Sequence, residues 1–122
     1  LDCNGFVGCW MSKVAPEFKL NGNKDQPREF YNARKQTRKT VDEIEYWDVI
    51  IWENMSHIAA INNPVAGQPG VFNVCQSAGG GPRSNAYRIV QAGPGKFRLD
   101  RIGGAYAGDV GGAVYVISHW SP

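Results

Sequence analysis

The stretch "QSAGGGPRSNAYRIV" (residues 76–90) contains the residue types that come closest to a chemical site. Three glycines and a proline lead into Arg83, and an alternating strand pattern then carries Arg88. Successive backbone N–H groups in a glycine-rich turn can surround an anion, and guanidinium groups bind phosphate oxygens in pairs. The stretch is therefore either an anion-binding loop or a turn between two strands.

The glycine segments do not match the known nucleotide-binding motifs. A P-loop requires GxxxxGK followed by Ser or Thr, whereas "GPGKF" ends in Phe97 and lacks the earlier glycine. The segment 103–108, "GGAYAG", is not a GxGxxG motif and does not lie between a strand and a helix. We interpret both segments as turns, and we expect no cofactor.

Basic residues cluster in the second half of the chain. In "KFRLDRIG" (96–103), alternation places Lys96, Arg98 and Asp100 on one face of a strand. Two interpretations remain open, a solvated sheet face and a shallow basic groove that meets a phosphate backbone. The candidate contacts to RNA or phosphate are Arg83, Arg88, Lys96 and Arg98. The net charge is only +2, so the molecule as a whole is not a polycation that coats nucleic acid.

The three cysteines are Cys3, Cys9 and Cys75, with no CxxC pair among them. With only two histidines in the chain, this set does not predict a structural zinc site. A Cys3–Cys9 disulfide across "CNGFVGC" is the first expectation, and Cys3–Cys75 is the second. Either disulfide indicates an oxidising compartment and therefore secretion, while three reduced thiols in a cytosolic protein remain the alternative.

The main helix is expected over residues 41–61. Thr40 and Glu43 form a capping-box pattern, and apolar residues then recur every three or four positions as far as Ile61. The aromatic and β-branched content of 44–52 leaves a strand there as the alternative. The sequon Asn54-Met55-Ser56 falls inside this predicted helix, where a sugar acceptor is not expected.

The flanking segments complete the expected fold. An N-terminal hairpin is predicted for "DCNGFVGCW", and one or two basic helical turns are predicted over 28–39. Four strand-like runs follow, separated by glycine and proline: 70–76, 85–91, 96–103 and 113–120. The prediction is a single α+β domain spanning 1–122, with the helix packed on a four- to five-stranded antiparallel sheet. No apolar run is long enough to cross a membrane, so no membrane contact is expected.

The C-terminal half, from "FNV" through the glycine-rich loop and "NAYRIV" to the last strand, resembles the secreted microbial ribonucleases that cut at guanine. The resemblance covers roughly residues 68–120 and concerns pattern rather than identity. It implies a helix packed on an antiparallel sheet, with Arg88 in the place of the arginine that contacts the scissile phosphate. It also implies a glutamate base and a histidine acid, but Asn73 and Gly103 stand at those positions. The catalytic pair is therefore missing.

A ribonuclease shell without its catalytic pair, with "LDC" near the start, is similar to the ribonuclease-like effectors of powdery mildew fungi. That resemblance implies a secreted, monomeric, non-catalytic protein that is delivered into plant cells. There it would bind RNA or a host protein and be recognised by immune receptors. Leucine replaces the aromatic residue of the family's N-terminal motif, and no cysteine lies near the C-terminus. The alternative is an active ribonuclease or toxin that uses His119 with Asp100 or Glu53.

Overall fold

The structure of the chain is a computed structural model that describes residues 26–32, 34–77, 82–104 and 109–118. Strands dominate the described residues, and helical structure is limited to one short α-helix and one 3-10 turn. In chain order the elements are α2 Gln26–Asn32, β1 Gln36–Thr37, η1 Val41–Glu43, β2 Val49–Trp52, β3 Ile58–Pro64, β4 Val71–Ser77, β5 Pro82–Gly93, β6 Lys96–Arg101 and β7 Val114–Ser118.

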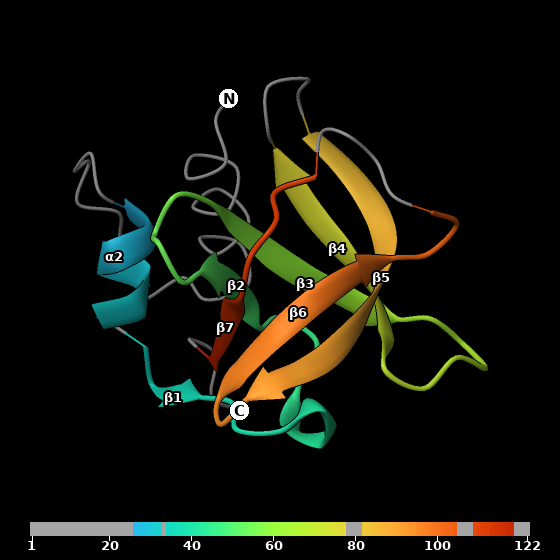
Figure 1. Ribbon diagram of the computed structural model, residues 1–122, viewed down its shortest axis with the longest axis horizontal. Coiled ribbons are helices and arrows are strands. Elements are labelled where there is room, and N and C mark those ends of the chain that lie inside the picture. The colour runs from blue at the N-terminus through green and yellow to red at the C-terminus, as the bar shows by residue number, and fades with distance from the viewer. Residues whose placement is uncertain (1–25, 33, 78–81, 105–108, 119–122) are drawn as a thin grey trace.

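Six of the strands close into an antiparallel barrel (Figure 1). Each strand from β2 to β6 pairs with the next one along the chain, and β7 returns to pair with β2 from Val49↔Ile117 to Trp52↔Val114. The closing contact between β6 and β7 is the pair Phe97↔Val114. The short strand β1 pairs with β7 farther along, at Ile117 and Ser118. The result is an up-and-down barrel without crossover connections.

Two irregularities in register help the sheet to curve. One lies between Ile61 and Pro64 on β3, and the other lies between Gln91 and Gly93 on β5. An extra residue on one strand of an antiparallel pair bends that strand and increases its twist. The sheet therefore curves enough for its edges to meet.

Alternating side chains fill the inside of the barrel. In the β4–β5 pair, Phe72 lies opposite Tyr87 and Val74 lies opposite Asn85, so these residues share the inner face. A six-stranded barrel is narrow, and its interior is filled by side chains rather than by an open channel. The inner cluster consists of Ile44, Ile50, Trp52, Ala59, Ile61, Phe72, Val74, Tyr87, Ile89, Phe97, Val114 and Val116.

The predicted main helix over 41–61 is wrong. Its first residues form only the 3-10 turn η1, and the rest forms β2, a hairpin turn and β3. All four residues of β2 are buried. Val49 and Ile51, which face outward, are as inaccessible to solvent as the inner-facing Ile50 and Trp52. Burial on both faces removes the alternation that normally marks a strand. The strand alternative for 44–52 is confirmed over residues 49–52.

The predicted α+β class is consequently wrong as well, because no helix covers a face of an open sheet in the described residues. The four strand-like runs of the second half are confirmed as β4, β5, β6 and β7. The helical segment predicted over 28–39 begins earlier and ends at Asn32. The predicted N-terminal hairpin and Cys3–Cys9 disulfide fall outside the described residues, and Cys75 on β4 is a free thiol. In the described chain, no helix is long and apolar enough to cross a membrane.

The two ends of the barrel differ in composition. At one end β2, β4 and β6 finish and β3, β5 and β7 begin, and the described residues 53–57, 102–104 and 109–113 lie there. We call this the polar end, because the inner face of the barrel near it carries ionisable and amide side chains. The opposite end contains η1 and the β5–β6 turn at Pro94 and Gly95.

Candidate functional site

Three of the four predicted phosphate contacts lie on the outside of the barrel, where acidic side chains accompany them. Arg88 lies opposite Asp100 in the β5–β6 register. Arg98 donates two hydrogen bonds to Asp100, at 3.0 and 3.2 Å. Lys96 forms an ion pair with Glu53 at 3.2 Å. These pairs reduce the positive potential of the outer face, which favours the interpretation as a solvated sheet face.

Arg83, the fourth predicted contact, lies on the opposite face of β5 from Arg88. It is in register with Gln76 on β4, and both residues share the inner face with Asn85 and Tyr87. The Nε atom of Arg83 is buried. The four predicted residues therefore do not form one site, and only Arg83 belongs to the polar end.

The polar end cluster brings together side chains from three strands and two connections. His57 precedes β3, Gln76 is near the end of β4, and Tyr87 is on β5. Arg101 ends β6, and it lies opposite Tyr87 in the β5–β6 register. The cluster consists of His57, Gln76, Arg83, Tyr87, Arg101 and Asp109, and its polar atoms lie above the apolar side chains of the inner core.

A chain of hydrogen bonds leads from His57 to Asp109, and each group in it donates to the next. Gln76 Nε2 donates to the Tyr87 hydroxyl at 3.1 Å, so Gln76 Oε1 accepts from His57 Nε2 at 2.9 Å. The Tyr87 hydroxyl in turn donates to Asp109 Oδ1 at 2.6 Å and accepts from Arg101 Nη2 at 2.9 Å. This pattern assigns the His57 proton to Nε2.

Arg101 and Asp109 form a two-point ion pair at the centre of the cluster. Arg101 Nε donates to Asp109 Oδ2, and Arg101 Nη2 donates to Asp109 Oδ1, both at 2.6 Å. The hydrogen bond from Arg101 lowers the pKa of Asp109, and the charge of Arg83 lowers it further. Asp109 is therefore a carboxylate at neutral pH, with its oxygens already engaged by Arg101 and Tyr87.

Burial sets the protonation of the two remaining titratable groups. Desolvation, followed by the contact with Asp109, raises the pKa of Tyr87 to about 12, so its hydroxyl stays protonated. Desolvation also lowers the pKa of His57, and nearby Arg83 acts in the same direction. Neutral His57 and protonated Tyr87 leave the two guanidiniums and one carboxylate as the formal charges of the cluster.

A small cavity lies against the cluster. Its volume is about 20 Å³, and it is lined by Trp52, Gln76, Tyr87, Leu99, Asp109 and Val110. This is room for about one water molecule. Close by on the inner face, the Oδ1 atom of Asn85 is buried and accepts no hydrogen bond from the described residues. Unsatisfied buried polar atoms are uncommon and are often found at functional sites.

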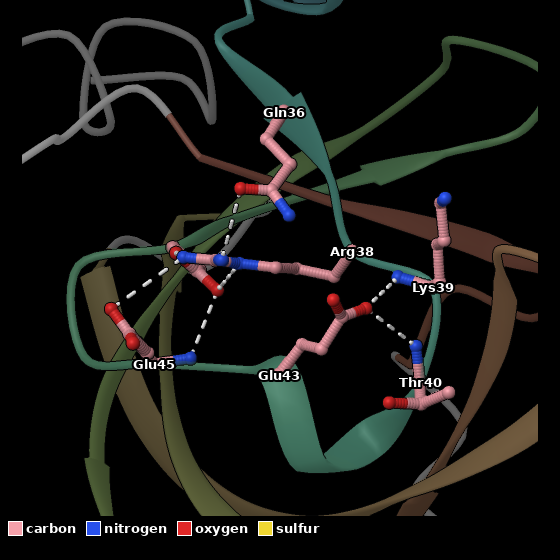
Figure 2. Close-up of polar contacts among 7 residues, drawn as sticks. Gln36, Arg38, Lys39, Thr40, Glu43 and Glu45 are labelled. Atoms are coloured by element: carbon pink, nitrogen blue, oxygen red, sulfur yellow. Dashed lines mark hydrogen bonds and ion pairs between the residues drawn. The ribbon is translucent and has the colours of Figure 1, made fainter.

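A second buried ion pair lies toward the opposite end, where it fixes the chain that enters the barrel. Arg38 donates to both carboxylate oxygens of Asp48, at 2.9 and 3.1 Å, and Asp48 also accepts from the N–H of Glu45. Figure 2 shows the Arg38 side chain extended between Gln36 and Glu45. These contacts connect the segment before η1 to the beginning of β2.

The predicted capping interaction at Thr40 is also visible in Figure 2, although it begins only a single turn. The Glu43 carboxylate accepts hydrogen bonds from the N–H groups of Thr40, at 3.1 Å, and Lys39, at 2.6 Å. These two bonds lower the pKa of Glu43. The capping box predicted at Thr40 and Glu43 is present, but the chain leaves the helical conformation at Ile44.

The catalytic alternative stays a prediction, because it depends on His119. Asp100 and Glu53 lie on the outside with Arg98 and Lys96, and His119 lies outside the described residues. Asn73, where the resemblance implied a glutamate, faces outward and donates to Asn63 Oδ1. No group of three or more metal-binding side chains occurs in the part of the chain that the structure describes.

Sequence reasoning missed Tyr87, Gln76, Arg101 and Asp109. The usable signal was the alternation of Arg83, Asn85 and Tyr87, which puts three polar side chains on the same strand face as Ile89. No protein-family model matches the chain, and neither the curated proteins nor the solved structures gave a match. The geometry of the fold therefore carries the functional argument.

Proposed function

We propose that this protein is a binding protein that holds a small anionic group at the polar end of its barrel. The observation that carries the proposal is the convergence of two guanidiniums at a partly enclosed place. Two guanidiniums, those of Arg83 and Arg101, accompany one carboxylate, that of Asp109. His57 adds no charge near neutral pH because burial lowers its pKa. A guanidinium binds carboxylates and phosphates through paired hydrogen bonds, which suits either kind of anion.

Partial exposure distinguishes this place from a sealed core. The side chains of Arg101 and Asp109 are 14% and 23% exposed, whereas Gln76 and Tyr87 beneath them are each 3% exposed. An anion can therefore approach the rim of the cluster while the hydrogen bonds below keep Arg101 in place. Charged hydrogen bonds at such a place are worth about 1.5–3 kcal/mol each.

Binding fits the protonation states of the cluster better than acid–base catalysis does. A general base must be able to take up a proton near the working pH. Asp109 has a lowered pKa and engaged oxygens, and His57 is buried with its Nε2 proton directed at Gln76. The expectation of a non-catalytic protein that acts by binding is therefore retained in this proposal. Secretion, delivery into a host cell and immune recognition stay predictions.

The proposal is tested by calorimetric titration of the purified protein with inorganic phosphate and, separately, with acetate. These two probes separate phosphate from carboxylate recognition, and saturable binding of either one supports the proposal. We expect Arg83→Gln to weaken that binding by about 10-fold or more, since it removes a charged hydrogen bond. Arg83→Lys keeps the charge and should restore part of the affinity.

Arg98→Gln is the matched control, because it removes a guanidinium from the outer face, where Asp100 accompanies it. It should leave the affinity within about twofold of the parent value, as expected for a screened surface charge. Absence of binding by both probes would refute the proposal. The proposal would also be refuted if a short single-stranded RNA bound with a steep salt dependence and if this binding required Arg88 and Arg98. That result would place the binding site on the outer face of the barrel.

A further inference from the structure

The sequon Asn54-Met55-Ser56 lies at an exposed hairpin turn and not in a helix. It connects β2, which ends at Trp52, to β3, which begins at Ile58. Asn54 and Ser56 are exposed, and Met55 has a φ of 61°, which turns the chain sharply. No sugar acceptor was expected here because the sequon was predicted to lie in a helix. The sequon lies at an exposed turn, so this argument no longer applies.

We propose that Asn54 is the acceptor of an N-linked glycan when the chain passes through a eukaryotic secretory compartment. The proposal does not depend on anion binding at the polar end. It depends on the exposure of the turn, the local hydrogen bonding and the free space beside it.

The side chain of Asn54 is held by a local hydrogen bond within the sequon. Its Oδ1 atom accepts a hydrogen bond from the Ser56 N–H at 3.0 Å. This contact joins residues i and i+2, so a nascent chain can form it before the barrel closes. Among the described residues, none accepts a hydrogen bond from the Asn54 Nδ2 group. The nitrogen that would carry the sugar is therefore accessible.

The chemistry is a transfer of an oligosaccharide from a lipid-linked diphosphate donor. Asn54 Nδ2 forms a bond to the anomeric carbon of the first sugar, and the bond from that carbon to the diphosphate oxygen breaks. The Nδ2 group loses one proton, and the lipid diphosphate leaves with the electron pair of the broken bond. No change of oxidation state occurs.

The folded protein has room for the attached sugar. A shallow groove of about 320 Å³ lies beside the turn, lined by Trp52, Glu53, Asn54, Gly111, Gly112 and Ala113. A Cβ atom placed on Gly111 or Gly112 would meet no other atom within 4 Å, so the neighbouring connection leaves open space. A glycan on Asn54 would extend over this groove without displacing a core side chain.

The other asparagines provide an internal comparison. Asn54-Met55-Ser56 is the only Asn-x-Ser/Thr sequence in the chain. Asn73 begins the related sequence Asn-Val-Cys, but it lies within β4 and its Nδ2 donates to Asn63 Oδ1 at 3.2 Å. Asn73 is therefore the matched site at which we expect no glycan.

The test is secretion of the full chain from yeast behind a cleavable leader peptide, followed by intact mass measurement. Peptide-N-glycosidase treatment in ¹⁸O water then converts a glycosylated asparagine into labelled aspartate, which peptide mass spectrometry locates. We expect the label at Asn54 of the parent protein. This assignment uses the parent protein alone, so it stands even if a variant is poorly secreted.

The variants confirm the site. Asn54→Gln and Ser56→Ala should each remove the glycan, whereas Ser56→Thr should retain it because threonine also completes the sequon. Asn73→Gln should leave the glycan unchanged. A secreted parent protein without any glycan, or a glycan that persists in Asn54→Gln, would overturn the proposal.

Discussion

Arg38–Asp48 and Arg101–Asp109 are two-point ion pairs of the same chemistry in different surroundings. The side chains of Arg38 and Asp48 are 11% and 3% exposed, and those of Arg101 and Asp109 are 14% and 23% exposed. Burial is the largest effect on Asp48 and raises its pKa, whereas the hydrogen bond from Arg101 is the largest effect on Asp109 and lowers its pKa. Desolvation therefore disfavours the charged form of the more buried carboxylate, Asp48, more strongly than that of Asp109.

The charge balance of the two places also differs. Arg38 contacts two carboxylates, those of Asp48 and Glu45, the second at 3.6 Å. At the polar end, the cluster formed by the described residues contains the guanidiniums of Arg83 and Arg101 and the carboxylate of Asp109. A guanidinium that already contacts two carboxylates offers little attraction to a further anion, whereas two guanidiniums gathered in one cluster can attract one. The comparison assigns Arg38–Asp48 to structure and the polar end cluster to binding.

The largest expected effect is loss of stability at the structural pair. Arg38→Met leaves the Asp48 carboxylate buried without its partner, and we expect a loss of about 3–5 kcal/mol in the free energy of unfolding. Urea denaturation measures it. The double variant Arg38→Met/Asp48→Leu removes both charges and should be more stable than the single variant. A single variant as stable as the parent protein would contradict the structural role of this pair.

The next effect separates stability from binding at the polar end. Asp109→Asn removes the carboxylate that occupies Arg101, so we expect tighter binding of the anion probe, by about 10-fold, together with a loss of about 1–3 kcal/mol in unfolding free energy. Calorimetry and urea denaturation measure the two changes. Asp48→Asn, at the structural pair, should lower stability without tightening binding. Weaker anion binding in Asp109→Asn would contradict this account and would show that the carboxylate is needed to hold Arg101 in position.

Tyr87→Phe removes the hydroxyl that connects Gln76, Arg101 and Asp109 while it preserves the ring in the core. We expect a loss of about 1–2 kcal/mol in unfolding free energy, because the amide of Gln76 is left without its acceptor. Differential scanning calorimetry measures the change. Tyr46→Phe is the control, since Tyr46 is 40% exposed. Equal effects of the two substitutions would rule out an energetic role for the hydrogen-bonded chain.

The smallest effect is a pH dependence caused by His57. Burial lowers its pKa from 6.5 in the folded protein, so the unfolded chain binds the proton first as pH falls. The stabilising contribution of neutral His57 is complete above pH 6.5 and is lost as pH falls from there to the folded pKa. His57→Gln should remove most of the change in unfolding free energy over this interval, as measured by urea denaturation at several pH values. A parent protein whose stability does not change over the interval would contradict the assignment.

The sequence predicted elements better than it predicted their assembly. The runs that form β4 to β7 are short, contain β-branched and aromatic residues and are separated by glycine and proline, so their strands could be identified. For β2 the alternation is absent, because Val49 and Ile51 are buried on the outside of the barrel and Ile50 and Trp52 on the inside. Closure was not predictable from pattern, since one register pair, Phe97↔Val114, joins β6 to β7.

For the site as well, single residues could be predicted from the sequence, but the way in which they come together could not. Arg83 was selected for its charge and its place after the glycines, and it does lie at the polar end. Arg88 was predicted from the strand pattern and from the ribonuclease resemblance, yet one strand carries Arg83 and Arg88 to opposite faces. Asp109 lies 22 residues from Tyr87 in a glycine-rich connection, so only the folded chain shows that they meet at 2.6 Å.

The assignment of binding to the polar end is tested most directly by observing arginine Nε–H resonances while inorganic phosphate is titrated into ¹⁵N-labelled protein. The account predicts saturable shifts for Arg83 and Arg101, with Arg88 and Arg98 unchanged. Shifts confined to Arg88 and Arg98, or no saturable shift at any arginine, would contradict it.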